Sequence, residues 1–318
     1  MSHTADNPPQ DMHFLLLPEF SVMGFVSAIE PLRVANRFRP GAYRWQILSL
    51  DGGPVVASNG MSINADAAFA HAAAIDTLFV VAGFHPLAFY QPALARWLRR
   101  LHHHGATLGA IDTGAFVLAE AGVLGAEPVT LHWEALAAFA ERFPGIAVTE
   151  ELFEIGTRAI TCAGGTSAID MMLALIAAKH GRELATRVSE QFVLGRIRSQ
   201  SDHQRMEIAA RYGLHNRKTN QVVKLMQEHI EDPLTADDLA AMISVTRRQM
   251  ERLFATHLRE TPARFYLGVR LDRARELLRQ TDMSILAVGI ACGFGSSSSF
   301  SRAYRTGFGL SPKDERGH

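Results

Sequence analysis

The sequence TADDLAAMISVTRRQMERLFATH, residues 235–257, contains two short helical patterns that meet at a tight turn. A threonine precedes each pattern, at Thr235 and Thr246, and threonine is a favoured residue at a helix N-cap. In the second pattern the apolar residues Met250, Leu253 and Phe254 recur at helical spacing. Because these residues form one buried face, the sequence predicts a pair of helices whose second member turns a polar side to solvent.

The same arrangement returns in residues 282–305, DMSILAVGIACGFGSSSSFSRAYR. A helix from Asp282 to Ala291, a turn at Cys292–Gly295 and a second helix over Ser296–Arg305 are expected. A run of serines can also be a flexible linker. Phe300 and Tyr304 follow the run at helical spacing, which favours the helix.

The two copies form an internal repeat. Arg248 and Ser298 hold matching places 50 residues apart, the length of one copy plus a long joining helix, Pro262–Gln280. The repeat predicts two helix-turn-helix units, a motif whose second helix enters the DNA major groove. Residues 217–318 hold 16 Lys and Arg against 12 Asp and Glu, and residues 1–216 hold 16 against 20. This clustering of positive charge favours a polyanionic partner.

The predicted DNA contacts lie on the solvent sides of the two second helices. Charged groups can pair with base edges and phosphates, and short hydroxyls suit a helix that approaches DNA closely. The residues predicted to bind DNA are Arg247, Arg248, Glu251, Arg252, Ser297, Ser298, Ser299, Arg302 and Arg305.

The region 234–316 closely resembles the DNA-binding domain of the AraC family. The motifs that show the resemblance include Thr261–Tyr266, Arg270–Leu278, Phe300–Arg302 and Gly309–Pro312. The resemblance implies an all-α domain that binds double-stranded DNA. One departure is Lys313–Arg316, where the family usually has a tyrosine just before the final arginine, so local packing is expected to differ.

The N-terminal part alternates apolar runs with helix-length stretches such as Val22–Arg37 and Pro92–His103. This alternation predicts an α/β sandwich with a parallel sheet covered on both faces. Ligands bind such sheets at the carboxyl ends of the strands. The runs expected as strands are His13–Leu17, Trp45–Leu50, Thr77–Val81, Ala106–Ile111 and Ala159–Ala163.

The run Ala110–Ala119 has the layout of a nucleophile elbow, a strand that turns sharply into a helix. With this run, residues 13–181 resemble the class I glutamine-amidotransferase-like (ThiJ/PfpI) group, whose enzymes place a catalytic histidine near Thr130–Glu134. The cysteine nucleophile of that group is replaced by Asp112, so we expect no catalytic residue and no enzyme activity. The alternative is a hydrolase- or amidase-like domain fused to a DNA reader. Asp112 could also serve only as a helix N-cap.

Joined to an AraC-type reader, this domain resembles that of the GlxA-like regulators, which often control catabolism of amino acids or quaternary amines. The resemblance implies a small-molecule inducer, and the negative charge of Asp112 favours a cationic or zwitterionic one. A domain that only dimerises is the other alternative. The predicted ligand-binding residues are Glu30, Phe84, His85, Asp112, Thr113, His132 and Trp133.

The 318 residues are expected to form a sensor or dimerisation domain (11–195), a connecting helix and linker (196–217) and the DNA-binding domain (218–318). The chain has only two cysteines and lacks a long apolar run, which favours a cytoplasmic protein with no membrane contact. The triple His102–His104 cannot share one ion on a helix, so no metal and no cofactor are expected. The expected partners are double-stranded DNA, an inducer, a second copy in a homodimer and, for an activator, RNA polymerase.

Overall fold

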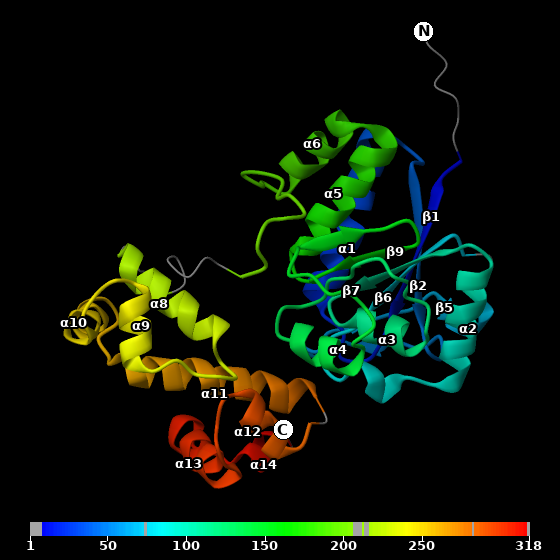
Figure 1. The fold of residues 1–318 in the computed structure, drawn as a ribbon. Helices are drawn as coiled ribbons and strands as arrows, with labels where there is room; N and C mark the ends of the chain where they lie inside the picture. The colour runs from blue at the N-terminus through cyan, green and yellow to red at the C-terminus, as the bar shows by residue number, and fades with distance from the viewer. Residues whose placement is uncertain (1–7, 73–74, 206–211, 213–215, 282, 317–318) are drawn as a thin grey trace. The chain divides into compact units, whose positions relative to one another are not determined.

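The computed structural model describes residues 8–72, 75–205, 212, 216–281 and 283–316. The chain divides into two compact units, Met1–Gln204 and Arg205–His318 (Figure 1). The first unit contains a mixed α/β architecture and the second is helical, as the sequence predicts.

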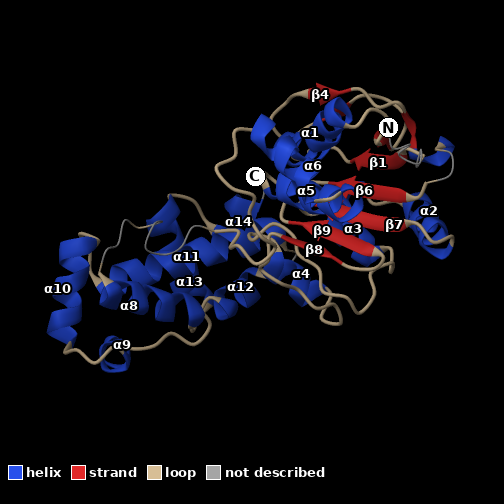
Figure 2. Cartoon of the chain, turned by 90° about the horizontal axis from the view of Figure 1, so that it is seen from above, coloured by secondary structure: helices blue, strands red, loops and turns tan. Residues whose placement is uncertain are grey.

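The first unit is built on a seven-stranded sheet with the strand order β5-β2-β1-β6-β7-β9-β8. Figure 2 shows the part of this sheet from β1 to β8. Its strands run parallel except β8, which pairs antiparallel with β9. A separate pair, β3 and β4, is antiparallel. The strands are β1 (Gln10–Leu16), β2 (Tyr43–Ser49), β3 (Val55–Val56), β4 (Ser62–Ile63), β5 (Ala67–Ala68), β6 (Thr77–Val81), β7 (Thr107–Ile111), β8 (Phe153–Ile155) and β9 (Ala159–Cys162).

Helices cover both faces of this sheet. On one face lie α1 (Val22–Phe38), α5 (Ser167–His180) and α6 (Arg182–Gln191), which pack against one another. The other face is covered by α2 (Pro92–His103), α3 (Gly114–Glu120) and α4 (Leu136–Arg142). Two short 3-10 helices, η1 (Phe69–His71) and η2 (Pro86–Phe89), lie in the connections.

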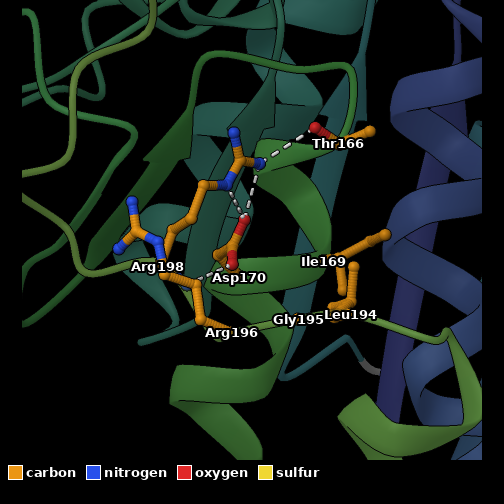
Figure 3. Close-up of a pocket in the computed structure, with 7 residues that line it drawn as sticks. All are labelled: Thr166, Ile169, Asp170, Leu194, Gly195, Arg196 and Arg198. Carbon is orange, nitrogen blue, oxygen red and sulfur yellow. Dashed lines mark hydrogen bonds and ion pairs between the residues drawn. The ribbon is translucent and has the colours of Figure 1, made fainter.

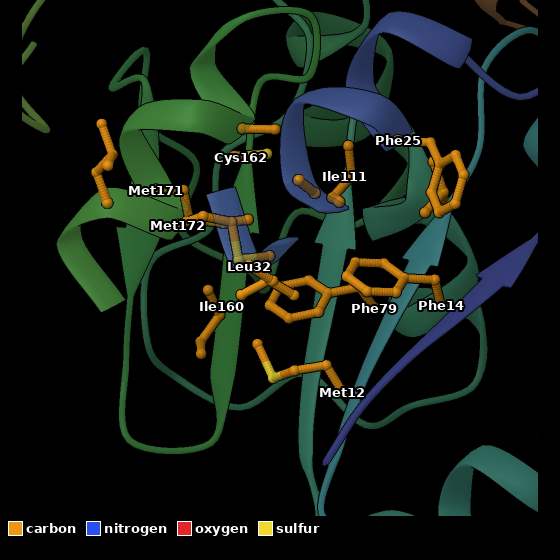
Figure 4. Close-up of a cluster of buried hydrophobic side chains, with 14 of the residues drawn as sticks. Met12, Phe14, Phe25, Leu32, Phe79, Ile111, Ile160, Cys162, Met171 and Met172 are labelled. Carbon is orange, nitrogen blue, oxygen red and sulfur yellow. The ribbon is translucent and has the colours of Figure 1, made fainter. Parts of the chain in front are cut away.

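Alternation along the buried strands creates two apolar layers. In β1, Phe14 and Leu16 face one layer while Leu15 faces the other. Figure 4 shows the first layer, in which Phe14 and Phe79 from neighbouring strands stack with ring centroids 5.7 Å apart. The predicted parallel sheet with two covered faces is therefore confirmed.

The segment after α6 differs from the expected connecting helix. Helix α6 ends at Gln191, and residues 196–205 contain turns and bends but no helix. Their polar side chains hydrogen-bond to the first unit, as in the pair of Arg198 and Asp170, instead of facing water along a helix. This part of the expected 196–217 connection is therefore wrong, and residues 206–211 and 213–215 lie outside the described residues.

The second unit begins its described helices with α8 (Arg217–Glu228). The two expected helix pairs follow, and the helix between them joins one pair to the other. The pairs are α9 (Ala236–Met242) with α10 (Arg247–His257) and α12 (Ile285–Ala291) with α13 (Ser297–Phe308); α11 (Pro262–Gln280) joins them and α14 (Pro312–Arg316) ends the unit. The helix expected to start at Asp282 is α12. Asp282 itself lies outside the described residues, and Ser284 is the N-cap of α12.

Candidate functional site

The first helix-turn-helix unit begins each of its helices with a capping box. Thr235 Oγ1 accepts a hydrogen bond from the Asp238 amide at 3.2 Å, and Thr246 Oγ1 accepts one from Gln249 at 3.2 Å. The side chains of Asp238 and Gln249 bond back to the cap amides in return. On the second helix, Met250 and Phe254 are fully buried and Leu253 is half-buried, so the predicted caps and the predicted apolar face are confirmed.

In the second helix-turn-helix motif, serines at the N-cap positions take the place of the capping boxes. Ser284 and Ser296 accept amide hydrogen bonds at the starts of α12 and α13. Its turn requires Gly293, because φ is +73° and an added Cβ would lie 2.5 Å from Pro233 Cγ. The joining helix holds this turn, since Arg270 donates to the carbonyls of Cys292 at 2.8 Å and Gly293 at 2.7 Å.

All four predicted DNA-contact residues of α10 are exposed, but they are not equivalent. Arg247 Nε donates to Glu251 Oε1 at 3.0 Å, and its Nη1 lies 3.9 Å from Asp237 Oδ2. Within the part of the chain that the structure describes, Arg248 and Arg252 form no side-chain hydrogen bond or ion pair. Their guanidinium groups are therefore the ones available to an incoming phosphate or base edge.

The serines at the start of α13 are exposed together with Arg302 and Arg305. Ser299 Oγ donates to the Ser296 carbonyl at 2.8 Å, so its hydroxyl proton serves the helix cap. The Ser298 hydroxyl lies 3.2 Å from that of Ser296. The four-serine run is thus a helix start with Ser296 outside the helix.

The departure from the AraC pattern near the C-terminus has a defined structural role. Glu315 is buried, with a side chain 1% exposed, and lies 3.0 Å from Arg275 Nε and 2.5 Å from Arg279 Nη2. The Tyr304 hydroxyl donates to its other oxygen at 3.0 Å. Burial alone would raise the pKa of Glu315, but these hydrogen bonds outweigh it and lower the pKa. The carboxylate therefore fastens α14 to α11 and α13.

In the first unit, the elbow is the turn Ile111–Gly114 between β7 and α3. Asp112 has a left-handed backbone with φ of 62°, and its amide donates to the Cys162 carbonyl at 3.1 Å. Glycine is required at Gly114, where a Cβ would lie 2.2 Å from the Val80 carbonyl oxygen. The predicted sharp turn from strand to helix is present, and Thr113, not Asp112, occupies the N-cap position.

Burial raises the pKa of Asp112 to about 7, while a hydrogen bond from the Thr113 amide opposes the rise and the charge of Glu134 adds to it. The nearby thiol of Cys162 is fully buried, and burial raises its pKa to about 12. A thiol in that state is not a nucleophile at neutral pH. The ionisable group that the elbow offers is therefore the carboxylate.

His132 and Trp133 lie in the loop after Leu131, with ring centroids 5.5 Å apart. Burial lowers the pKa of His132, and the charge of Glu134 opposes this shift. Because Glu134 acts on both Asp112 and His132, the three groups share one electrostatic neighbourhood. Sequence reasoning gave Glu134 no role, although it lies two residues after His132 in the same motif.

The remaining predicted ligand residues lie in different settings. The Thr113 hydroxyl donates to the Gly83 carbonyl, which ties the loop after β6 to the elbow. In that loop Phe84 is 54% exposed and His85 is exposed with φ of 53°.

Glu30 has a different neighbour from the one expected. Its carboxylate lies 2.6 Å from Arg33 Nη2, so its charge is offset on α1 itself. The end of α1 beside the elbow is its start, where a Cβ on Gly24 would lie 3.0 Å from Ile111 Cγ2. Glu30 is six residues further, about 9 Å along the helix. The ligand-binding role of Glu30 stays a prediction.

A hollow of about 450 Å³ lies elsewhere in the first unit, against the start of α5 (Figure 3). It is lined by Thr166, Ile169, Asp170, Leu194, Gly195, Arg196 and Arg198. Among the described residues, no group of three or more His, Cys, Asp and Glu side chains is arranged to hold a metal ion. No described helix is long and apolar enough to cross a membrane.

Comparisons with known proteins agree with this division. Residues 13–178 match the DJ-1/PfpI family, and residues 239–318 match a helix-turn-helix domain. The chain is 62% identical over 307 residues to the HTH-type transcriptional regulator CdhR of Pseudomonas aeruginosa, covering 96% of this chain and 91% of that protein. It is 35% identical over 306 residues to the HTH-type transcriptional regulator GlxA of Rhizobium meliloti, covering 95% and 94%.

Among solved structures, an AraC family transcriptional regulator from Pseudomonas putida matches with a TM-score of 0.55 and 31% identity. That match covers 58% of this chain and all of the other. The predicted fold and the predicted family are both confirmed by these relatives. The chain belongs to the HTH-type transcriptional regulators that join a DJ-1/PfpI domain to an AraC-type DNA-binding domain.

Proposed function

We propose that this regulator binds a small cationic or zwitterionic metabolite at the elbow and that the ligand alters how its two helix-turn-helix units engage DNA. An amino acid or a quaternary amine has the required charge. The observation that carries the proposal is the position of Asp112, a half-buried carboxylate on the left-handed residue of the elbow, with the charge of Glu134 acting on it.

Two nearby carboxylates disfavour each other's ionised form, especially where water is partly excluded. A bound cation relieves that repulsion, whereas an anion beside Asp112 increases it. Trp133 and Phe84 are aromatic, and an ammonium over such a ring gains about 0.5–2 kcal/mol. Thr113 lies in the same turn, and His132 belongs to the same electrostatic neighbourhood through Glu134. A cation is therefore the ligand class that this electrostatic setting supports best.

We propose that the first unit has no catalytic activity. The elbow has a carboxylate in place of a thiolate, and the thiol of Cys162 is buried with a pKa of about 12. Purified full-length protein is expected to turn over no ester, amide or dicarbonyl substrate. A rate abolished by Asp112→Ala would instead support the hydrolase alternative.

In the second unit, we propose that Arg248, Glu251 and Arg252 contact one major-groove segment, and that Ser297, Ser298, Arg302 and Arg305 contact the next. Two recognition helices on one chain are suited to segments about one helical turn apart, roughly 34 Å. The protein is proposed to act in the cytoplasm as a homodimer, with RNA polymerase as a further partner where it activates transcription.

Isothermal titration calorimetry with the full-length protein tests the ligand class. Glycine betaine, L-carnitine and L-arginine serve as cationic or zwitterionic probes, and succinate serves as an anionic one. At least one of the first three is expected to bind wild type, and Asp112→Asn is expected to weaken that binding about tenfold or more, equal to about 1.4 kcal/mol.

Glu141→Gln is the matched control, because it removes one negative charge from an exposed position on α4 of the same unit. Its affinity for the probe is expected to equal that of wild type. Tight succinate binding that requires Asp112, or equal cation affinity in wild type and Asp112→Asn, would refute the proposal.

A further inference from the structure

The segment Arg196–Gln204, here called the strap, lies along the first unit and is the last part of the chain before the second unit begins. Near its start, Arg198 binds Asp170 through its backbone amide at 2.9 Å and its guanidinium at 2.7 and 2.9 Å (Figure 3). The Arg198 guanidinium also donates to Thr166 Oγ1 at 2.9 Å. Asp170 is 3% exposed, so this anchor reaches into the interior of the unit.

The end of the strap is anchored by Gln204. Its side-chain amide donates to Thr130 Oγ1 at 3.0 Å, to the Leu131 carbonyl at 3.0 Å and to the Glu151 carbonyl at 2.9 Å. Between the two anchors, Glu151 and His203 form an isolated antiparallel bridge. The strap is thus held at both ends by directed hydrogen bonds.

Apolar packing contributes little to this attachment. Ile197, the one apolar side chain of the strap, is 37% exposed, whereas Phe192 and Leu194, just before the strap, pack against the first apolar layer. The hollow of about 450 Å³ is lined by residues of α5 and by Arg196 and Arg198 of the strap. A segment held mainly by exchangeable polar contacts can leave its site without exposing a hydrophobic core.

Both anchors lie next to the two segments that border the elbow, here called its walls: the loop that contains His132 and the turn at Gly164–Gly165. Thr130 and Leu131, which Gln204 binds, directly precede His132 in the chain. Thr166, which Arg198 binds, follows Gly164–Gly165, and a Cβ on Gly164 would lie 2.7 Å from Asp112 Oδ2. A change at the elbow that moves either wall therefore also moves a strap anchor.

We propose that the strap is a detachable link that transmits the state of the elbow to the DNA-binding unit. When it is attached, the chain leaves the first unit at Gln204; when it is released, the connection to the second unit is longer by the strap itself. A longer flexible connection lowers the effective concentration at which linked parts act together. This transmission rests on the proposed role of the elbow as the sensing site.

A disulfide across the Glu151–His203 bridge pins the strap. Directly opposed residues of an antiparallel pair have Cα atoms about 4.5–5.5 Å apart, within the range that a disulfide spans. The native Cys162 and Cys292 are both buried, so they do not compete for the new pair. Full-length Glu151→Cys/His203→Cys protein is compared oxidised and reduced, which makes each sample its own control.

Gln204→Ala releases the other end of the strap without leaving a buried charge. Arg142→Ala is the matched control, because it removes an arginine–carboxylate pair with Glu120 in the same unit but outside the strap. Tryptophan fluorescence checks folding of the first unit in every variant, since Trp45, Trp97 and Trp133 all lie within it.

Hydrogen exchange and DNA affinity are the two readouts, with DNA selected in vitro from a random pool by the wild-type chain. In the released protein, amides of the elbow, which the strap does not touch, are expected to exchange at least threefold faster, and oxidation of the pinned protein is expected to slow them. Affinity for the selected DNA is expected to differ at least twofold between pinned and released proteins, with Arg142→Ala like wild type.

Equal elbow exchange and equal DNA affinity in pinned and released proteins would overturn the proposal. It would also be overturned if the strap amides of wild type exchanged as fast as those of the released protein. Because no ligand is present in these experiments, a failure here is distinguishable from a failure of the cation proposal.

Discussion

Asp112 occupies the space that a side chain on Gly164 would need: a Cβ atom on Gly164 would lie 2.7 Å from both the Cβ and the Oδ2 of Asp112. The backbone of Gly164 is also left-handed, with φ of +81°. The Asp112 carboxylate can therefore occupy this position only because residue 164, in the loop after β9, has no side chain. A substitution at Gly164 tests this directly.

Gly164→Ala is expected to destabilise the first unit by about 2–5 kcal/mol, through left-handed strain and overpacking against Asp112. Gly165→Ala is the control, because its φ of +54° brings similar strain while its Cβ meets nothing within 4 Å. Urea unfolding followed by tryptophan fluorescence measures both. Equal losses of stability would show that the contact with Asp112 is not limiting.

The raised pKa of Asp112 predicts a stability that depends on pH. The folded unit holds this proton up to about pH 7, whereas the unfolded chain loses it near 3.8, so stability falls as pH rises between those values. Asp112→Asn is expected to remove the decline and to be more stable than wild type at pH 8 by about 1–3 kcal/mol. Urea unfolding at pH 5 and pH 8 checks this; parallel pH curves for the two proteins would contradict it.

The affinity for a cation should also depend on the ionisation of Asp112, but it should rise with pH where the stability falls. The ionised form of Asp112 attracts a cation, so affinity is expected to rise with pH through about 7 and binding should release a proton. Calorimetry in two buffers of different ionisation enthalpy counts that proton. Asp112→Asn should lose both effects, and a wild-type affinity that is flat from pH 6 to pH 8 would argue against Asp112 as the contact.

Arg248 and Arg252 are the α10 guanidinium groups without a described partner. Replacing either with alanine is expected to cost about 1–3 kcal/mol on in vitro selected DNA if the arginine pairs with a guanine. Fluorescence anisotropy on a shuffled duplex is the control, where the loss should be smaller because only phosphate contacts remain. Identical losses on both duplexes would assign these arginines to the backbone alone.

Glu315 predicts a charge-dependent contribution to the second unit. Glu315→Gln is expected to cost about 1–3 kcal/mol, because it removes the partner of Arg275 and Arg279 while leaving the pocket filled. Tyr304→Phe, which removes only one hydroxyl donor, should cost about 1 kcal/mol. The lowered pKa means that the stabilisation is present above about pH 4.5 and is lost as pH falls through the folded pKa.

All three tryptophans lie in the first unit, so tryptophan fluorescence does not follow unfolding of the second unit. Circular dichroism at 222 nm, which detects helix, is used for the second unit instead. A Glu315→Gln protein as stable as wild type at pH 7 would show that α14 is held by packing alone. The acid-induced loss should be absent from that variant.

Local signals explain which parts could be read from the sequence. Thr235 and Thr246 are caps whose effect lies within three residues, so these two helix starts could be predicted from neighbouring residues. The apolar periodicity at Met250 and Phe254 likewise records which face is buried. The strand-turn-helix pattern around Asp112 identified the elbow for the same reason.

Long-range contacts explain what could not be read. The role of Glu134 depends on its loop folding towards the carboxyl end of β7, which no local pattern encodes. The strap resembles a solvated helix because its Arg and Gln residues are common on helix surfaces, yet their partners, such as Asp170, are distant in sequence. Glu315 similarly meets Arg275 from 40 residues away.

The exposed side chains of α10 and α13 differ, and this difference bears on the orientation of the protein on DNA. One helix presents arginines and a glutamate, and the other begins with serines and continues to Arg302 and Arg305. Two different readers in fixed order along one chain require two different half-sequences in the same order. With both helices reading bases as proposed, turning the site end for end would set each helix against the wrong bases, so a single bound chain would lie on its site in one direction only.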